Sequence, residues 1–143
     1  MARVDDVATA ILERQGTMST WKLQKLVYYC QAWHLVWEEQ PLFGDPIQAW
    51  ANGPVVRSLY DQHRGQFTVN AWPSGNAANL SAGESSTVDA VLKTYGEMSG
   101  ADLSALTHRE PPWARARVGL SDGERGNSEI SLEAMAEYYG GLL

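Results

Sequence analysis

The chain has 143 residues, 44% of them hydrophobic, and carries a formal net charge of −6. A chain of this length and composition predicts one folded domain that needs no disulfide or metal, and it argues against intrinsic disorder. The acidic balance argues against a nucleic-acid partner, because phosphate binding needs clustered lysine and arginine, and it suits a basic protein partner better.

The number of cysteines and the N-terminal segment indicate the cellular compartment of the protein. Cys30 is the only cysteine, so no internal disulfide can form and a reducing compartment is expected. The chain runs from Met1 into an acidic amphipathic segment without the apolar core of a secretion signal, which predicts a cytoplasmic protein. Its longest apolar stretch, residues 26–37, is interrupted by Gln31 and His34 and falls short of the roughly 20 residues that span a bilayer, so no membrane role is expected.

Two helices are expected at the start of the chain. Residues 4–15 place apolar side chains three and four apart, with Asp5 and Asp6 in the first turn and Arg14 in the last, as the helix dipole favours. Residues 19–37 are apolar almost all the way round the helix. That pattern predicts a central, buried helix.

The second helix carries its charges against its own dipole. Lys22 and Lys25 lie in the first turn, and Glu38 and Glu39 follow the last. Each mismatch costs roughly 0.3–1 kcal/mol if nothing compensates it. We therefore expect counter-charges for the two lysines, either carboxylates elsewhere in the fold or acidic groups on another molecule.

Residues 40–46 are rich in proline and glycine and predict a turn, followed by a short extended piece over 47–51. Asn52, Gly53 and Pro54 predict the entry of a third helix, which would run from Pro54 to about His63, because proline is favoured at the first helical position. Residues 67–69 can form a brief strand, and we expect it to pair with residues 47–50.

Four further helices are expected. They begin near Ser81 or Ser85, at Gly100 after a Ser99 cap, at Pro111, and at Leu132 after a Ser131 cap. We therefore predict a mainly α fold, a compact single domain over residues 1–143, with about five to seven helices around a central buried helix and at most a small two-stranded β ribbon.

Enzymatic chemistry has one candidate in the sequence. Cys30 and His34 lie four apart on one helical face, and His63 and His108 could complete a zinc site with them. The same pair lies on an apolar stripe, where a buried thiol is ordinary packing. The carboxylates make no close pair, and phosphate-binding loops and nucleophile elbows are absent. The sequence favours no enzyme, no metal and no cofactor; a small cysteine/histidine hydrolase or metal enzyme is the alternative.

The densest basic group, Arg109, Arg115 and Arg117, surrounds Trp113. We expect these arginines to form salt bridges with the many acidic residues. Trp113 follows two prolines, and it either plugs the edge of the core or forms a rigid recognition corner, since Trp and Arg dominate protein interfaces.

Several separated segments resemble one protein family. Residues 19–29 (Ser-Thr-Trp-Lys-Leu-Gln-Lys-Leu-Val-Tyr-Tyr) come first, followed by residues 47–50, then Gly53, Pro54, Val55 and Tyr60. Later come His108, Glu110, Pro112 and Trp113, and the final segment over 130–139. Together, and in this order, they resemble the Panacea antitoxin domain, also called SocA-like, of phage-associated proteins.

This resemblance implies an antitoxin of bacterial or phage (prophage) origin that neutralises a protein toxin encoded nearby by direct binding. In one branch of the family the toxin is presented to a Clp-type protease. The resemblance implies no catalytic residue, no metal and no cofactor. A phage structural or scaffolding protein is a further alternative.

The signature residues that the resemblance marks are the candidate partner-binding residues. They are Lys22, Gln24, Lys25, Tyr28, Tyr29, Trp50, Gly53, Pro54, Val55, Tyr60, His108, Glu110, Pro112 and Trp113. We expect the polar groups on the second helix to form one surface with the 50–55 corner and Trp113. That surface either builds the domain or touches the partner.

Overall fold

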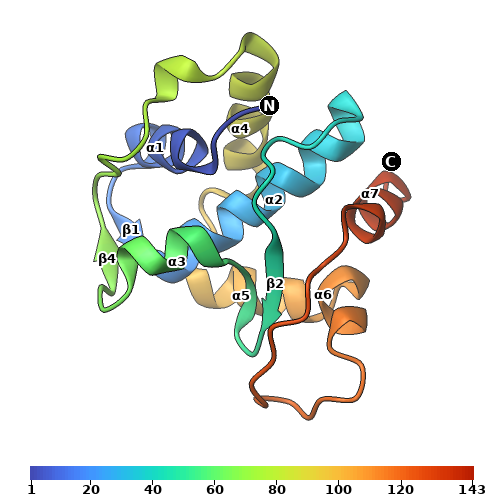
Figure 1. The fold of residues 1–143 in the computed structure, drawn as a ribbon. Helices are drawn as coiled ribbons and strands as arrows, with labels where there is room; N and C mark the ends of the chain where they lie inside the picture. The colour runs from blue at the N-terminus through green and yellow to red at the C-terminus, as the bar shows by residue number, and fades with distance from the viewer.

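The computed structural model describes all residues, 1–143. Its helices are α1 (Val4–Gln15), α2 (Thr20–Glu38), α3 (Arg57–His63), α4 (Ala82–Tyr95), α5 (Gly100–His108), α6 (Pro111–Ala116) and α7 (Leu132–Gly140), with a 3-10 turn η1 (Ala77–Asn79) (Figure 1). Two antiparallel ribbons join β1 (Met18–Ser19) to β4 (Thr68–Val69) and β2 (Ile47–Trp50) to β3 (Gly53–Val56). The predicted mainly helical fold is confirmed, although the chain forms two short ribbons where we expected at most one.

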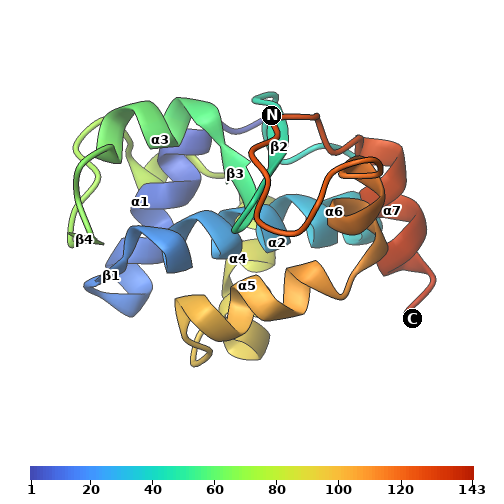
Figure 2. The same ribbon diagram turned by 90° about the horizontal axis from the view of Figure 1, so that it is seen from below.

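Helix α2 is the centre of the molecule. It crosses the middle of the fold, with α3 on one side and α5 on the other (Figure 2). It also packs against α1, α4 and α7, and every side chain from Leu23 to Ala32 is buried. The predicted central helix is therefore confirmed. No helix combines the length and the apolar character that crossing a membrane requires.

Two of the misplaced charges of α2, Lys22 and Glu38, lie against the ends of its antiparallel neighbour α4. Lys22 donates through Nζ to the carbonyl of Gly96, 2.6 Å away at the C-terminal cap of α4. At the other end Glu38 lies against Gly83, in the first turn of α4, where an added β-carbon would come within 2.6 Å of Oε1. The expectation of carboxylate partners is wrong for Lys22, because the ends of α4 supply the opposite partial charges.

The predicted helix from Pro54 to His63 is wrong in its first part. Residues Gly53–Val56 form β3, which pairs with β2 in a register that places Ala49 opposite Pro54, and α3 begins only at Arg57. Val55 and Val56 are β-branched, which favours a strand. Gly53 has φ +124°, a conformation that turns the chain back on β2 and that glycine tolerates.

The other predicted strand exists, but its partner is different. Thr68 and Val69 pair with Ser19 and Met18, not with residues 47–50. The second edge of β2 is covered instead by the chain before α7. Ala49 donates its N–H to the carbonyl of Ser128 (2.7 Å), and Ile130 donates to the carbonyl of Ile47 (2.8 Å).

The predicted helix starts are confirmed where a local cap signals them. Ser81 forms a capping box with Glu84, and Ser99 and Ser131 each accept a hydrogen bond from the backbone three residues later. Helix α4 ends at Tyr95 with Gly96 as its cap. One core of buried apolar side chains includes residues from α1, α2, α4, α5, α6 and α7, so the helices enclose a common interior.

Candidate functional site

The β2–β3 hairpin is held by side chains from the helices around it. Five of its carbonyls each accept a hydrogen bond from a side chain: Ala49 from Arg117 (3.0 Å), Trp50 from Trp113 (2.8 Å), Asn52 from Ser104, Pro54 from Lys25 (3.1 Å) and Val56 from Gln24 (3.2 Å). The donors come from α2, α5, α6 and the residue that follows α6. The hairpin is therefore fixed at its turn and along both strands.

Lys25 is the most unusual of these donors because it is a buried cation. Its side chain is 1% exposed, and Nζ donates to the Pro54 carbonyl with no carboxylate in ion-pair range. Burial lowers the pKa of Lys25 to about 7. The expected counter-charge is absent here too, and a carbonyl takes its place.

The side-chain amide of Gln24 also binds the backbone of β3, through both its oxygen and its nitrogen. Oε1 accepts from the Val56 N–H at 2.8 Å, and Nε2 donates to the Val56 carbonyl. Nε2 also lies 2.9 Å from Nε2 of His63, which accepts its second proton. Burial lowers the pKa of His63 and so favours this neutral, accepting imidazole.

A second buried polar group joins α2 to α7. Glu110 accepts through Oε1 from the hydroxyls of Tyr29 (2.6 Å) and Tyr139 (2.7 Å), and the Tyr28 hydroxyl lies 3.0 Å from that of Tyr139. Burial raises the pKa of Glu110, while the two tyrosine hydrogen bonds oppose that shift. All four side chains are buried, so this network stabilises the domain interior.

Trp113 plugs the edge of the core, the first of the two roles expected for it. It is 8% exposed, and the exposed imidazole of His108 stacks on it with ring centroids 3.9 Å apart. The buried Arg117 guanidinium lies 5.2 Å from its ring centroid and donates to the carbonyls of Ser121 and Glu124. The expected salt bridges are absent, because none of the ion pairs in the structure includes Arg109, Arg115 or Arg117.

The accessible side of the hairpin carries two aromatic rings and an arginine. Trp50 and Tyr60 are half-buried and meet edge to face, with centroids 4.8 Å apart. The exposed guanidinium of Arg57 lies about 6 Å from both ring centroids, and its Nε donates to Asp61. We call Trp50, Arg57 and Tyr60 the hairpin platform. Tryptophan, tyrosine and arginine are the residues that contribute most to protein interfaces.

The residues of the alternative zinc or hydrolase site do not come together. His34 binds the Thr87 hydroxyl (2.7 Å), while His63 and His108 have the partners described above. The Cys30 thiol is fully buried, and that burial raises its pKa. A thiol in this setting stays protonated and is shielded from substrates.

The predicted site residues fall into two groups. Most are buried, and all of these except Pro112 belong to the hairpin, to its support or to the tyrosine network: Gln24, Lys25, Tyr28, Tyr29, Gly53, Pro54, Val55, Glu110, Pro112 and Trp113. Trp50, Tyr60, Lys22 and His108 keep accessible surface. The sequence interpretation missed Ser104 and Arg57, and it assigned Arg117 to salt bridges, because no local pattern marks which carbonyl a distant polar side chain will reach.

The comparisons with known proteins give one match. A sequence model of the family described as antitoxin SocA-like, Panacea domain, matches residues 23–114. The matched range includes the β2–β3 hairpin and the Gln24 and Lys25 side chains that support it. It also includes Glu110 and Tyr29 of the tyrosine network. No curated protein and no solved structure matches the chain.

Proposed function

The chain belongs to the SocA-like antitoxin family with the Panacea domain, and from this membership we propose that it neutralises a protein toxin encoded nearby in a bacterial or prophage toxin–antitoxin system. The proposed action is stoichiometric binding in the cytoplasm, not catalysis. We propose that residues 1–143 act as a single Panacea domain. Occlusion of the toxin is the primary route, and delivery of the bound toxin to a Clp-type protease is the second.

The observation that supports a binding role most directly is the hairpin platform. Its aromatic rings and arginine keep accessible surface. Trp50 lies on the hairpin backbone that five side-chain hydrogen bonds fix, and Arg57 and Tyr60 lie on α3, which follows β3 directly. Because this surface is already ordered, binding of a partner to it costs little conformational entropy. We therefore place the principal toxin contact at Trp50, Arg57 and Tyr60.

Co-expression with the neighbouring open reading frame tests this proposal. We expect the neighbour alone to arrest growth and this chain to restore it. Trp50→Ala and Tyr60→Ala should abolish rescue and weaken the purified complex at least tenfold, as truncation of an interface anchor does. Trp21→Ala is the matched control, because Trp21 is 48% exposed and lies outside the platform.

Circular dichroism separates lost binding from lost folding in these variants. The platform proposal predicts unchanged melting with lost rescue, and it is wrong if both platform variants fold and still rescue growth.

Toxin half-life in cells with and without the Clp protease separates the two routes of neutralisation, occlusion and delivery to the protease. Occlusion predicts the same half-life in both strains.

A further inference from the structure

A line of aromatic side chains runs from the surface of α2 to the buried tyrosines. Trp37 is 43% exposed, and its ring stacks on that of Trp33 with centroids 5.3 Å apart. Trp33 is half-buried and meets the ring of Tyr139 on α7, with centroids 5.5 Å apart. Aromatic rings at these separations are in contact, and an electron passes readily between π systems that touch. The three rings therefore connect the solvent to the interior of the domain.

The inner end of this line meets a base. Tyr139 is fully buried, and its hydroxyl donates its only proton to Oε1 of Glu110, 2.7 Å away. The Tyr28 hydroxyl, 3.0 Å from that of Tyr139, is therefore the donor of the bond between them. A phenol that loses an electron becomes a strong acid, and a base that takes its proton must lie within hydrogen-bond reach. Glu110 meets this condition, and burial raises the pKa of Glu110, which makes it a better acceptor of the proton.

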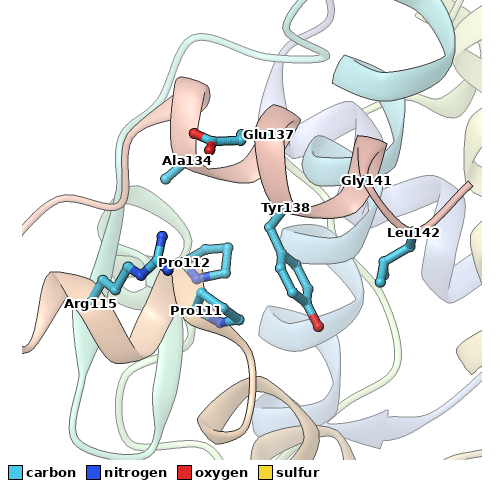
Figure 3. Close-up of a pocket in the computed structure, with 8 residues that line it drawn as sticks. All are labelled: Pro111, Pro112, Arg115, Ala134, Glu137, Tyr138, Gly141 and Leu142. Carbon is cyan, nitrogen blue, oxygen red and sulfur yellow. The ribbon is translucent and has the colours of Figure 1, made fainter.

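The neighbouring phenols lack one of these two contacts. Tyr138 meets Tyr139 edge to face, with centroids 4.9 Å apart, and lines a surface groove between α6 and α7 (Figure 3). The hydroxyl bonds that Glu110 accepts come from Tyr29 and Tyr139, so Tyr138 has no such base. Tyr29 has the base, but its ring partners are all tyrosines. Tyr139 combines a tryptophan contact with a carboxylate.

We propose that Trp37, Trp33 and Tyr139 form a one-electron relay that carries an oxidising equivalent from a small radical oxidant in solution to Tyr139. Trp37 first loses an electron to the oxidant. Electrons then pass from Trp33 to Trp37 and from Tyr139 to Trp33, while the hydroxyl proton of Tyr139 moves to Oε1 of Glu110. Both tryptophans end reduced, and the products are the reduced oxidant, protonated Glu110 and a neutral phenoxyl radical on Tyr139. The relay is independent of toxin binding at the hairpin platform.

Pulse radiolysis of the full chain with the azide radical, a one-electron oxidant of tryptophan, tests this relay. The reference chain carries Tyr60→Phe, because Trp50 and Tyr60 form the other contact between a tryptophan ring and a tyrosine ring. At a dose well below one radical per chain, we expect tryptophanyl absorption to be replaced by phenoxyl absorption in a first-order phase. Its rate should not change with protein concentration. A rate proportional to protein concentration would show transfer between molecules and would overturn the relay.

Variants of the reference chain locate the path, with circular dichroism to check that each one folds. Trp33→Phe and Tyr139→Phe should each abolish the first-order phase. Glu110→Gln should slow it about tenfold or more, because the amide accepts a hydrogen bond but cannot take the proton. Trp37→Phe changes a partly exposed side chain and should lower the amplitude of the phase. The matched control is Tyr138→Phe, which removes a phenol beside Tyr139 that has no base, and it should leave rate and amplitude unchanged.

Two results would overturn the proposal whichever buried variants fold. One is a parental amplitude in Trp37→Phe, since the oxidising equivalent would then enter elsewhere. The other is loss of the phase in Tyr138→Phe, which would place the radical on the wrong tyrosine. A parental rate in folded Trp33→Phe, Tyr139→Phe or Glu110→Gln would equally exclude that residue from the path and reject the relay.

Discussion

The side chain of Lys25 occupies the space that a β-carbon on Gly53 would need. Such an atom would lie 2.5 Å from Cε of Lys25 and 3.2 Å from the Thr107 hydroxyl. Gly53 also has φ +124°, which residues with a side chain rarely adopt. Conformation and packing therefore both require glycine at the turn of the hairpin, and the buried lysine rests directly against it.

Gly53→Ala should lower the free energy of unfolding by about 3 kcal/mol, because backbone strain and the clash with Lys25 add together. Gly123→Ala is the matched control, since Gly123 has φ +79° and nothing within 4 Å of the added carbon. It should lose only about 1 kcal/mol. Urea denaturation measures both values, and equal losses would show that the contact with Lys25 is unimportant.

Lys25 should give stability an alkaline pH dependence. Its folded pKa is about 7 against a model-peptide value of 10.5, so between these values the unfolded chain binds more protons. Stability therefore rises as pH increases from about 7 to about 10, and below pH 7 the full destabilisation by the buried charge is present.

Lys25→Met should flatten this slope, because it keeps the side-chain volume and removes the charge. Stability at pH 7 should be unchanged or higher, whereas Lys25→Ala should lose about 2–4 kcal/mol through the cavity it leaves. Chemical denaturation across pH 6–10 measures both variants. A parent protein with a flat profile in this range would contradict the assignment.

Glu110 should give stability the opposite pH dependence in the acidic range, so that stability falls as pH rises. Burial raises its pKa above the ordinary 4.5, so the folded state binds more protons. The corresponding stability is present below pH 4.5 and is lost as pH rises through the folded pKa. Glu110→Gln should remove this dependence while its amide oxygen still accepts from Tyr29 and Tyr139.

Glu110→Ala should instead lose about 2–4 kcal/mol at pH 7, because two buried phenols lose their acceptor. Thermal melting of both variants at pH 4 and pH 7 measures the difference. The network is unimportant to stability if Glu110→Ala melts like the parent protein.

The Cys30 thiol should be unreactive in the native protein. It is fully buried, and burial raises its pKa, so both access and thiolate formation are suppressed. A chromogenic disulfide reagent should modify it slowly without denaturant and rapidly, with one equivalent per chain, in guanidinium chloride. Rapid stoichiometric reaction of the native chain would contradict the burial of α2.

The parts of the fold that the sequence predicts correctly depend on local patterns. Ser81, Ser99 and Ser131 each precede a helix by one residue, so the caps can be identified from neighbouring residues alone. The burial of α2 follows from apolar side chains on all its faces. Neither inference needs a contact between distant residues.

The errors occur where distant segments decide the structure. Pro54 is as suitable for a helix start as for an edge strand, and only the pairing with Ala49 selects the strand. Lys22 is compensated by Gly96, a partner far along the chain that no spacing rule indicates. For the candidate site, the family signature includes three of the five side chains that hold the hairpin, Gln24, Lys25 and Trp113. It does not include Ser104 or Arg117, and Arg57 resembles an ordinary surface charge until the structure places it beside Trp50.

The five carbonyl contacts that hold the β2–β3 hairpin have a kinetic consequence. A loop that must reorder slows the capture of a partner, whereas a surface already in its final shape can be captured on first encounter. Partners of different affinity for this hairpin should therefore differ mainly in how long each complex lasts, and much less in how quickly it assembles.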